Sequence, residues 1–170
     1  ANMQIEENTA LASRRGKSPS LRKGLTSKER EFYREQLKTL GLGLEDRMTS
    51  KVGLLSGGQR QALTLLMATL KRPRLLLLDE HTAALDPKTA AKVLELTDQI
   101  VQRDRLTTLM ITHNMKDAIT HGNRLIMMNA GKIIFDASGE EKKRLTVQDL
   151  LVKFEEAGGE DALSDRMILA

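Results

Sequence analysis

The sequence predicts an α/β protein whose core is a mainly parallel sheet. Four consecutive leucines at positions 75–78 end in Asp79 and Glu80, as in a short buried strand that carries polar residues at its tip. Helical spacing of apolar residues follows over positions 88–103, and a β-rich run, Thr-Thr-Leu-Met-Ile-Thr, occupies 107–112. Since strand, helix and strand in this order form a parallel crossover, we expect residues 74–112 to belong to an α/β sheet.

The first third of the chain is predicted to be mostly helical. We expect a short helix over residues 3–12, a polar and basic loop over 13–26, and a second helix over 27–40. Gly41 and Gly43 end the second helix, and its apolar face is predicted to be formed by Phe32, Leu37 and Leu40.

A third helix is expected to begin after Ser56. Ser56 has the residue type of an N-cap, and Gln59 stands three positions later, as in a capping box. Leucines and a methionine at helical spacing continue the pattern until Pro73 stops it. Ser56 is therefore predicted to cap a helix, whatever further role it has.

After Pro73 the strand over 74–79 is apolar throughout, so we expect both of its faces to be buried. Residues 124–129 and 132–136 flank Ala130-Gly131 and predict an antiparallel hairpin. A terminal helix is expected over 146–157, followed by a weakly ordered tail from Gly158-Gly159.

Composition excludes several classes of protein. The 170 residues are 40% hydrophobic and 29% charged, as in ordinary globular domains, and no apolar run approaches the roughly 20 residues that span a bilayer. The absence of cysteine and of a visible signal peptide favours a cytoplasmic location. The net charge of +4 comes with one tyrosine, three phenylalanines and no tryptophan, so we expect no nucleic-acid partner.

Four segments together resemble the ATP-binding cassette (ABC) family. They are the signature segment Leu55-Ser56-Gly57-Gly58-Gln59, the Walker B strand that ends in Asp79-Glu80, the D-loop Ala83-Ala84-Leu85-Asp86-Pro87, and the switch segment Ile111-Thr112-His113-Asn114-Met115. The resemblance implies a partial ABC-type P-loop NTPase domain, with a helical signature subdomain and the C-terminal part of a mainly parallel RecA-like sheet.

The resemblance also implies a role for individual residues. Asp79 would help to hold Mg²⁺, Glu80 would polarise the attacking water, and His113 would contact the γ-phosphate of ATP. The nucleotide would further be bound by Ser56, Gly57, Gly58, Gln59 and Asp86. His81 and His121 are interpreted as packing or surface residues.

A complete cassette also needs a G-x-x-x-x-G-K-S/T loop that holds the phosphates. Gly16-Lys17-Ser18 does not fit, because Leu11 stands in place of the first glycine and Pro19 follows where a helix should propagate. We expect a C-terminal portion of a cassette, inactive alone as an ATPase. Its expected divisions are a helical subdomain (1–72), part of the nucleotide-binding core (73–145), and a terminal helix and tail (146–170).

By resemblance, the function expected of the intact cassette is to bind and hydrolyse ATP and so power an ABC transporter. Its expected partners are a second cassette, in a head-to-tail dimer, and a membrane-spanning permease subunit at the inner face of the membrane. Residues 1–72 would face the permease. Two alternatives stay open, namely a non-transport ABC-type ATPase of DNA repair or translation, and a non-catalytic fragment that only binds a partner.

Overall fold

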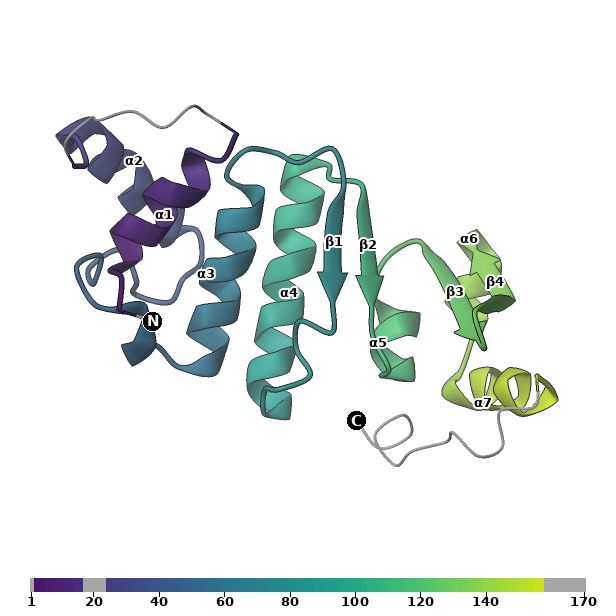
Figure 1. Cartoon of the computed structure of the whole chain (residues 1–170). Coiled ribbons are helices and arrows are strands. Elements are labelled where there is room, and N and C mark those ends of the chain that lie inside the picture. Colours follow the sequence, from purple (N-terminus) through teal and green to yellow (C-terminus); the bar gives the residue numbers. More distant parts are fainter. Residues whose placement is uncertain (1, 17–23, 158–170) are drawn as a thin grey trace. The chain divides into compact units, whose positions relative to one another are not determined.

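The computed structural model describes residues 2–16 and 24–157 and divides into two compact units, with the boundary between Leu109 and Met110 (Figure 1). The predicted division at residues 72 and 145 follows sequence motifs and stays a prediction. Lys17, Ser18 and the predicted tail at Gly158-Gly159 lie outside the described residues.

The first unit is built from helices that pack through leucines and isoleucines. They are α1 (Ile5–Ser13), α2 (Ser27–Lys38), α3 (Gly57–Thr69) and α4 (Pro87–Asp104), with a single 3₁₀ turn, η1 (Val52–Leu54), before α3. α1 contacts α2 and α3, and α3 contacts α4. The largest fully buried side chains of this unit are Ile5, Leu37, Leu44, Leu63, Leu66 and Ile100.

Two details of the N-terminal helices differ from the prediction. Met3 and Gln4, expected inside the first helix, precede α1, because the Met3 carbonyl accepts a hydrogen bond of 3.0 Å from the Val52 amide and Gln4 caps the helix. Phe32, expected on the buried face of α2, is 50% exposed, and Tyr33 is buried in its place. Tyr33, Leu37 and Leu40 are spaced by four and three residues, which is the period of one helix face, whereas Phe32 lies five residues before Leu37 and so falls off that face.

A two-stranded sheet joins β1 (Leu76–Asp79) to β2 (Thr108–Ile111), and Figure 1 shows both strands running in the same direction. The prediction that β1 is buried on both faces is wrong. Leu76 and Leu78 are buried, whereas Leu75 and Leu77 are 52% and 64% exposed. Successive side chains of a strand point to opposite faces, so within the described residues only one face of β1 is covered.

The second unit contains α5 (Met115–Thr120), β3 (Arg124–Asn129), β4 (Lys132–Ser138), α6 (Gly139–Arg144) and α7 (Val147–Glu156). The predicted hairpin is confirmed. β3 and β4 are antiparallel, and Ala130 and Gly131 both have positive φ in the turn, at 47° and 75°. The buried core of this unit is formed by Met115, Leu125 and Leu150, to which α5, β3 and α7 each contribute one residue. The terminal helix was predicted, but α6 was not.

None of the helices in the described part of the chain combines the length and the apolar character that crossing a membrane requires.

Candidate functional site

The signature segment forms the N-terminus of α3, as its sequence predicts. The Ser56 hydroxyl accepts a hydrogen bond of 3.2 Å from the Gln59 amide, and the Gln59 side chain accepts one of 3.1 Å from the Ser56 amide, which completes the capping box. The first hydrogen bond within the helix comes from the Arg60 amide to the Ser56 carbonyl. The amides of Gly57 and Gly58 therefore precede this ladder, at the positive end of the helix dipole, where an anion is favoured.

The two glycines also allow α3 to approach the start of α4 closely. A Cβ atom on Gly57 would lie 3.0 Å from Leu85 Cδ2, and a Cβ on Gly58 would lie 2.3 Å from Thr89 Cγ2. Real Cβ atoms essentially never lie within 3.0 Å of another heavy atom, so the 2.3 Å contact, unlike the tight contact at Gly57, favours glycine at position 58 by packing. The contacts place the signature glycines against residues on either side of Asp86, the D-loop aspartate.

Asp86 caps α4. Its carboxylate accepts a hydrogen bond of 3.1 Å from the Thr89 amide, and Pro87 occupies the first helical position. Hydrogen bonds from Thr89, first from its side chain and then from its amide, lower the pKa of Asp86. The side chain proposed to bind nucleotide is thus held as a carboxylate by the same threonine that packs against Gly58.

Asp79 and Glu80 lie where the sequence places them, at the carboxyl end of β1, and both are exposed. Glu80 has φ of 43°, in the left-handed region that residues with a Cβ rarely adopt. Backbone strain of this kind tends to be retained at functional sites. The backbone bends at Glu80, directly after the last residue of β1.

The three histidines lie in different surroundings. His81 Nε2 is 3.1 Å from Thr97 Oγ1, and the Thr97 hydroxyl donates to the Val93 carbonyl at 2.8 Å, so the imidazole is the donor to Thr97. This contact supports the packing interpretation of His81. His121 follows the last residue of α5 as its C-cap. His113 is half-buried, stands directly before Asn114, the N-cap of α5, and belongs to the second unit, whereas the other predicted site residues lie in the first.

The described residues contain no group of three or more His, Cys, Asp or Glu side chains able to hold a metal ion. Mg²⁺ in nucleotide sites is commonly held by only one or two carboxylates, with phosphate oxygens and water completing its shell. The exposed Asp79 carboxylate at a strand end has the donor chemistry for that arrangement. The residues present therefore fit a magnesium ion that arrives with a nucleotide.

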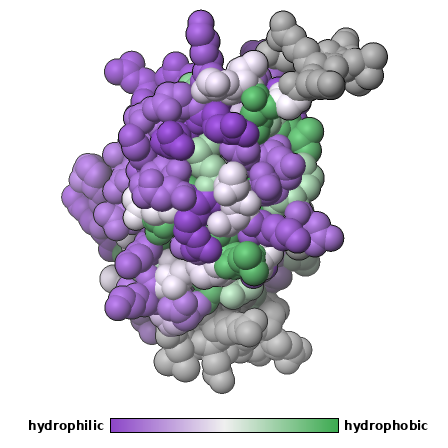
Figure 2. Space-filling view, turned by 90° about the vertical axis from the view of Figure 1, so that its left-hand side faces the viewer, coloured by the Kyte–Doolittle hydropathy of each residue, from purple (hydrophilic) through white to green (hydrophobic). Residues whose placement is uncertain are grey.

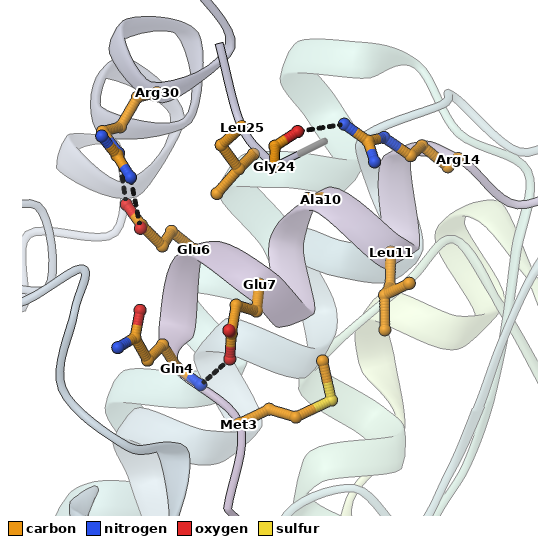
Figure 3. A pocket seen from close by; sticks show the side chains of 10 residues that line it. All are labelled: Met3, Gln4, Glu6, Glu7, Ala10, Leu11, Arg14, Gly24, Leu25 and Arg30. Atoms are coloured by element: carbon orange, nitrogen blue, oxygen red, sulfur yellow. Dashed lines mark hydrogen bonds and ion pairs between the residues drawn. The ribbon is translucent and has the colours of Figure 1, made fainter. Parts of the chain in front are cut away.

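A separate pocket of about 500 Å³ lies on α1 and the approach to α2 (Figure 3). Glu6, only 4% exposed, forms one wall and accepts hydrogen bonds of 2.8 and 2.9 Å from the Arg30 guanidinium. Met3, Leu11 and Leu25 supply apolar lining. This pocket was not predictable from sequence patterns, because its lining combines residues that are more than twenty positions apart.

Comparison with known proteins shows which class of protein this chain resembles. Residues 1–83 match the family model described as "ABC transporter", and this match, together with the relatives and the solved structure below, supports a fragment of an ABC transporter ATPase. It is 48% identical over 156 residues to the tyrosine transport ATP-binding protein of Clostridioides difficile, covering 92% of this chain and 62% of that protein. It is 35% identical to the phosphonates import ATP-binding protein PhnC of Thiobacillus denitrificans, covering 82% of this chain and 56% of that protein.

A solved ATP-binding cassette of an ABC transporter, in its ADP conformation, has the same fold. The TM-score is 0.71 at 23% sequence identity, and the match covers 91% of this chain and 63% of that one. This structural similarity confirms the predicted fold class. The chain spans about three fifths of the length of these relatives.

Proposed function

We propose that this chain supplies the signature, Walker B, D-loop and switch elements of an ATP-hydrolysing subunit of an ABC importer. The observation that carries the proposal is the packing of Gly57 and Gly58, at a capped helix N-terminus, against the residues that flank Asp86. This contact couples a site suited to an anion with the segment that follows the two strand-end carboxylates. The import function rests on the relatives, of which one is named for tyrosine transport and another for phosphonate import.

In the proposed mechanism, Glu80 accepts a proton from the attacking water, for which its exposed carboxylate and its sharply turned backbone suit it. Asp79 would hold Mg²⁺, which would neutralise charge on the phosphates. His113 donates a hydrogen bond to the γ-phosphate. Ser56 Oγ and the amides of Gly57 and Gly58 bind the γ-phosphate of a nucleotide whose other contacts come from a second cassette.

The signature segment is proposed to act on the nucleotide of a second cassette. A head-to-tail dimer would bring α3 of one chain to the phosphate-binding loop of the other, and no such loop sequence occurs in residues 1–170. A head-to-tail dimer contains two such composite sites, and its closure around ATP is the step proposed to drive transport.

The permease is proposed to contact residues 1–72 on the cytoplasmic side of the membrane. The pocket on α1 supports this choice, since it offers Met3, Leu11 and Leu25 as apolar contacts beside the Glu6–Arg30 ion pair. The surrounding face is mostly hydrophilic with small, separate hydrophobic areas (Figure 2). A small apolar pocket with a polar rim suits a reversible contact with another subunit.

The test uses a complete cassette, meaning a polypeptide that contains residues 1–170 together with a phosphate-binding loop. Glu80→Gln keeps the shape of the side chain but removes its basicity, so ATP should still bind, hydrolysis should fall by about 10²-fold or more, and closed dimers should accumulate. Glu95→Gln makes the same chemical change on an exposed site of α4 and should leave turnover unchanged. Normal turnover by the Glu80→Gln cassette would show that Glu80 is not the base.

A further inference from the structure

Lys142 is a buried lysine that the proposed mechanism does not use. It lies on α6, and only 5% of it is exposed. Burial lowers the pKa of Lys142, as expected when an ammonium group loses its hydration. Its neighbour Lys143, by contrast, is 71% exposed and pairs with Glu140 on the surface.

The Lys142 ammonium donates a hydrogen bond to the carbonyl of Ile119, in the last turn of α5. The final carbonyls of a helix lack partners within the helix and carry the negative end of its dipole, so a cation there is favourable. α5 is only six residues long. A helix of this length has little stability of its own, and its ends have to be held by other parts of the molecule.

The other end of α5 is held by local hydrogen bonds. The Asn114 side chain accepts from the Asp117 amide at 3.1 Å, and the Asn114 amide donates to the Thr112 hydroxyl at 3.1 Å. Between the two ends, Met115 packs in the core of the second unit with Leu125 and Leu150. His113 therefore sits between two hydrogen-bonded residues at the start of a helix whose far end is bonded to Lys142.

We propose that Lys142 is a positioning residue that fixes α5 and, through it, the backbone from which His113 projects. The value of this for ATP hydrolysis rests on the proposed contact between His113 and phosphate. Burying a lysine costs free energy, because its ammonium group loses hydration. A methionine of similar length would fill the same space without that cost. The hydrogen bond to the Ile119 carbonyl, which methionine could not donate, accounts for a lysine at this position.

The experiment compares Lys142→Met with the matched control Lys143→Met in the whole 170-residue chain. Amide hydrogen exchange of Ala118 and His121, whose amides donate to the carbonyls of Asn114 and Asp117 at the two ends of α5, is measured by NMR together with the ring signals of His113. Lys142→Met should speed exchange at both amides by about tenfold or more, since a bond to a charged donor is lost. It should also shift the His113 signals while leaving those of His81 unchanged, and Lys143→Met should change neither. Lys142→Arg, which keeps a cationic donor, should restore the His113 signals at least in part.

Unchanged α5 exchange and unchanged His113 signals in Lys142→Met would overturn the proposal. If Lys142→Met unfolds, Lys142→Gln is used in its place. The glutamine side chain keeps a polar group at this position but is too short to reach the Ile119 carbonyl as lysine does. The proposal would also be overturned if the α5 amides exchange at the same rate in Lys142→Gln as in Lys143→Met. These measurements need no nucleotide, so they are independent of the proposed function. Full ATPase activity of a His113→Gln complete cassette would refute the phosphate contact and leave the link between Lys142 and α5 intact.

Discussion

Gly58 offers a direct test of the packing between the signature helix and α4. In Gly58→Ala, the new Cβ would lie 2.3 Å from Thr89 Cγ2, well inside the roughly 3.5 to 4.0 Å of a normal carbon contact. Turning Thr89 about χ1 would move the methyl group away but would also displace the hydroxyl that hydrogen-bonds Asp86. We therefore expect the contact to be relieved by a shift of α3 from α4 rather than by a free rotation.

The magnitude follows from two opposing effects. Overpacking of this kind typically costs about 1 to 3 kcal/mol, and replacing a helical glycine by alanine gains at most about 1 kcal/mol. Gly58→Ala should therefore lower the free energy of unfolding by up to about 3 kcal/mol. In a Thr89→Ser background Cγ2 is absent, and the nearest remaining atoms, Thr89 Cβ and Val93 Cγ2, lie at 3.8 and 4.0 Å, which are ordinary contacts. There the same substitution should be neutral or stabilising.

Urea unfolding of the four chains in this double-mutant cycle, followed by circular dichroism, measures the coupling between the two positions. We expect a coupling free energy of about 1 to 3 kcal/mol, since the collision disappears when Cγ2 is removed. If Gly58→Ala has the same effect with threonine and with serine at position 89, the close approach of α3 and α4 is not what requires glycine here.

Three further predictions concern pH, activity and partners. Hydrogen bonds from Thr26 and then from Arg14 lower the pKa of Glu29 from 4.5 to about 2. The stability this carboxylate contributes is thus present above pH 4.5 and lost as pH falls toward 2, and Glu29→Gln should flatten that part of a plot of unfolding free energy against pH. The isolated 170-residue chain should release no phosphate from ATP, and steady release that Glu80→Gln abolishes would contradict this. Crosslinks from a permease should fall within residues 1–72, and crosslinks confined to 130–170 would refute that assignment.

Features set by neighbouring residues were predictable from the sequence. The capping box of Ser56 and Gln59 depends on residues within one turn of helix, and the residue types alone specify it. The hairpin turn at Ala130-Gly131 is equally local. The predicted order of strand, helix and strand over 74–112 is confirmed. The spacing of apolar residues within each element is enough to predict that element, without knowledge of the others.

Features that depend on distant residues were not predictable. The exposure of Leu77 is decided by which elements cover β1, and a run of four leucines does not reveal that. The contact between Gly58 and Thr89 joins two helices, and the bond from Lys142 to Ile119 joins two short helices on either side of a hairpin. The start of α5 at Met115 is an exception, because Asn114 with Asp117 three positions later is a local N-cap pattern that the sequence contains.

The central claim is that the signature segment acts on the nucleotide of a partner cassette, and complementation between two defective complete cassettes tests it. Gly57→Asp places a carboxylate where the proposed phosphate should bind, while its Cβ meets only the flexible end of Leu85, at 3.0 Å, so the chain should fold. Gly57→Ala controls for the added Cβ. A cassette with Gly57→Asp, mixed with one whose phosphate-binding loop is inactivated, forms dimers in which one site carries both defects and the other carries none. ATPase activity in the mixture, absent from either cassette alone, is the result we predict, whereas a folded Gly57→Asp cassette that has lost nucleotide binding at its own loop would contradict the account.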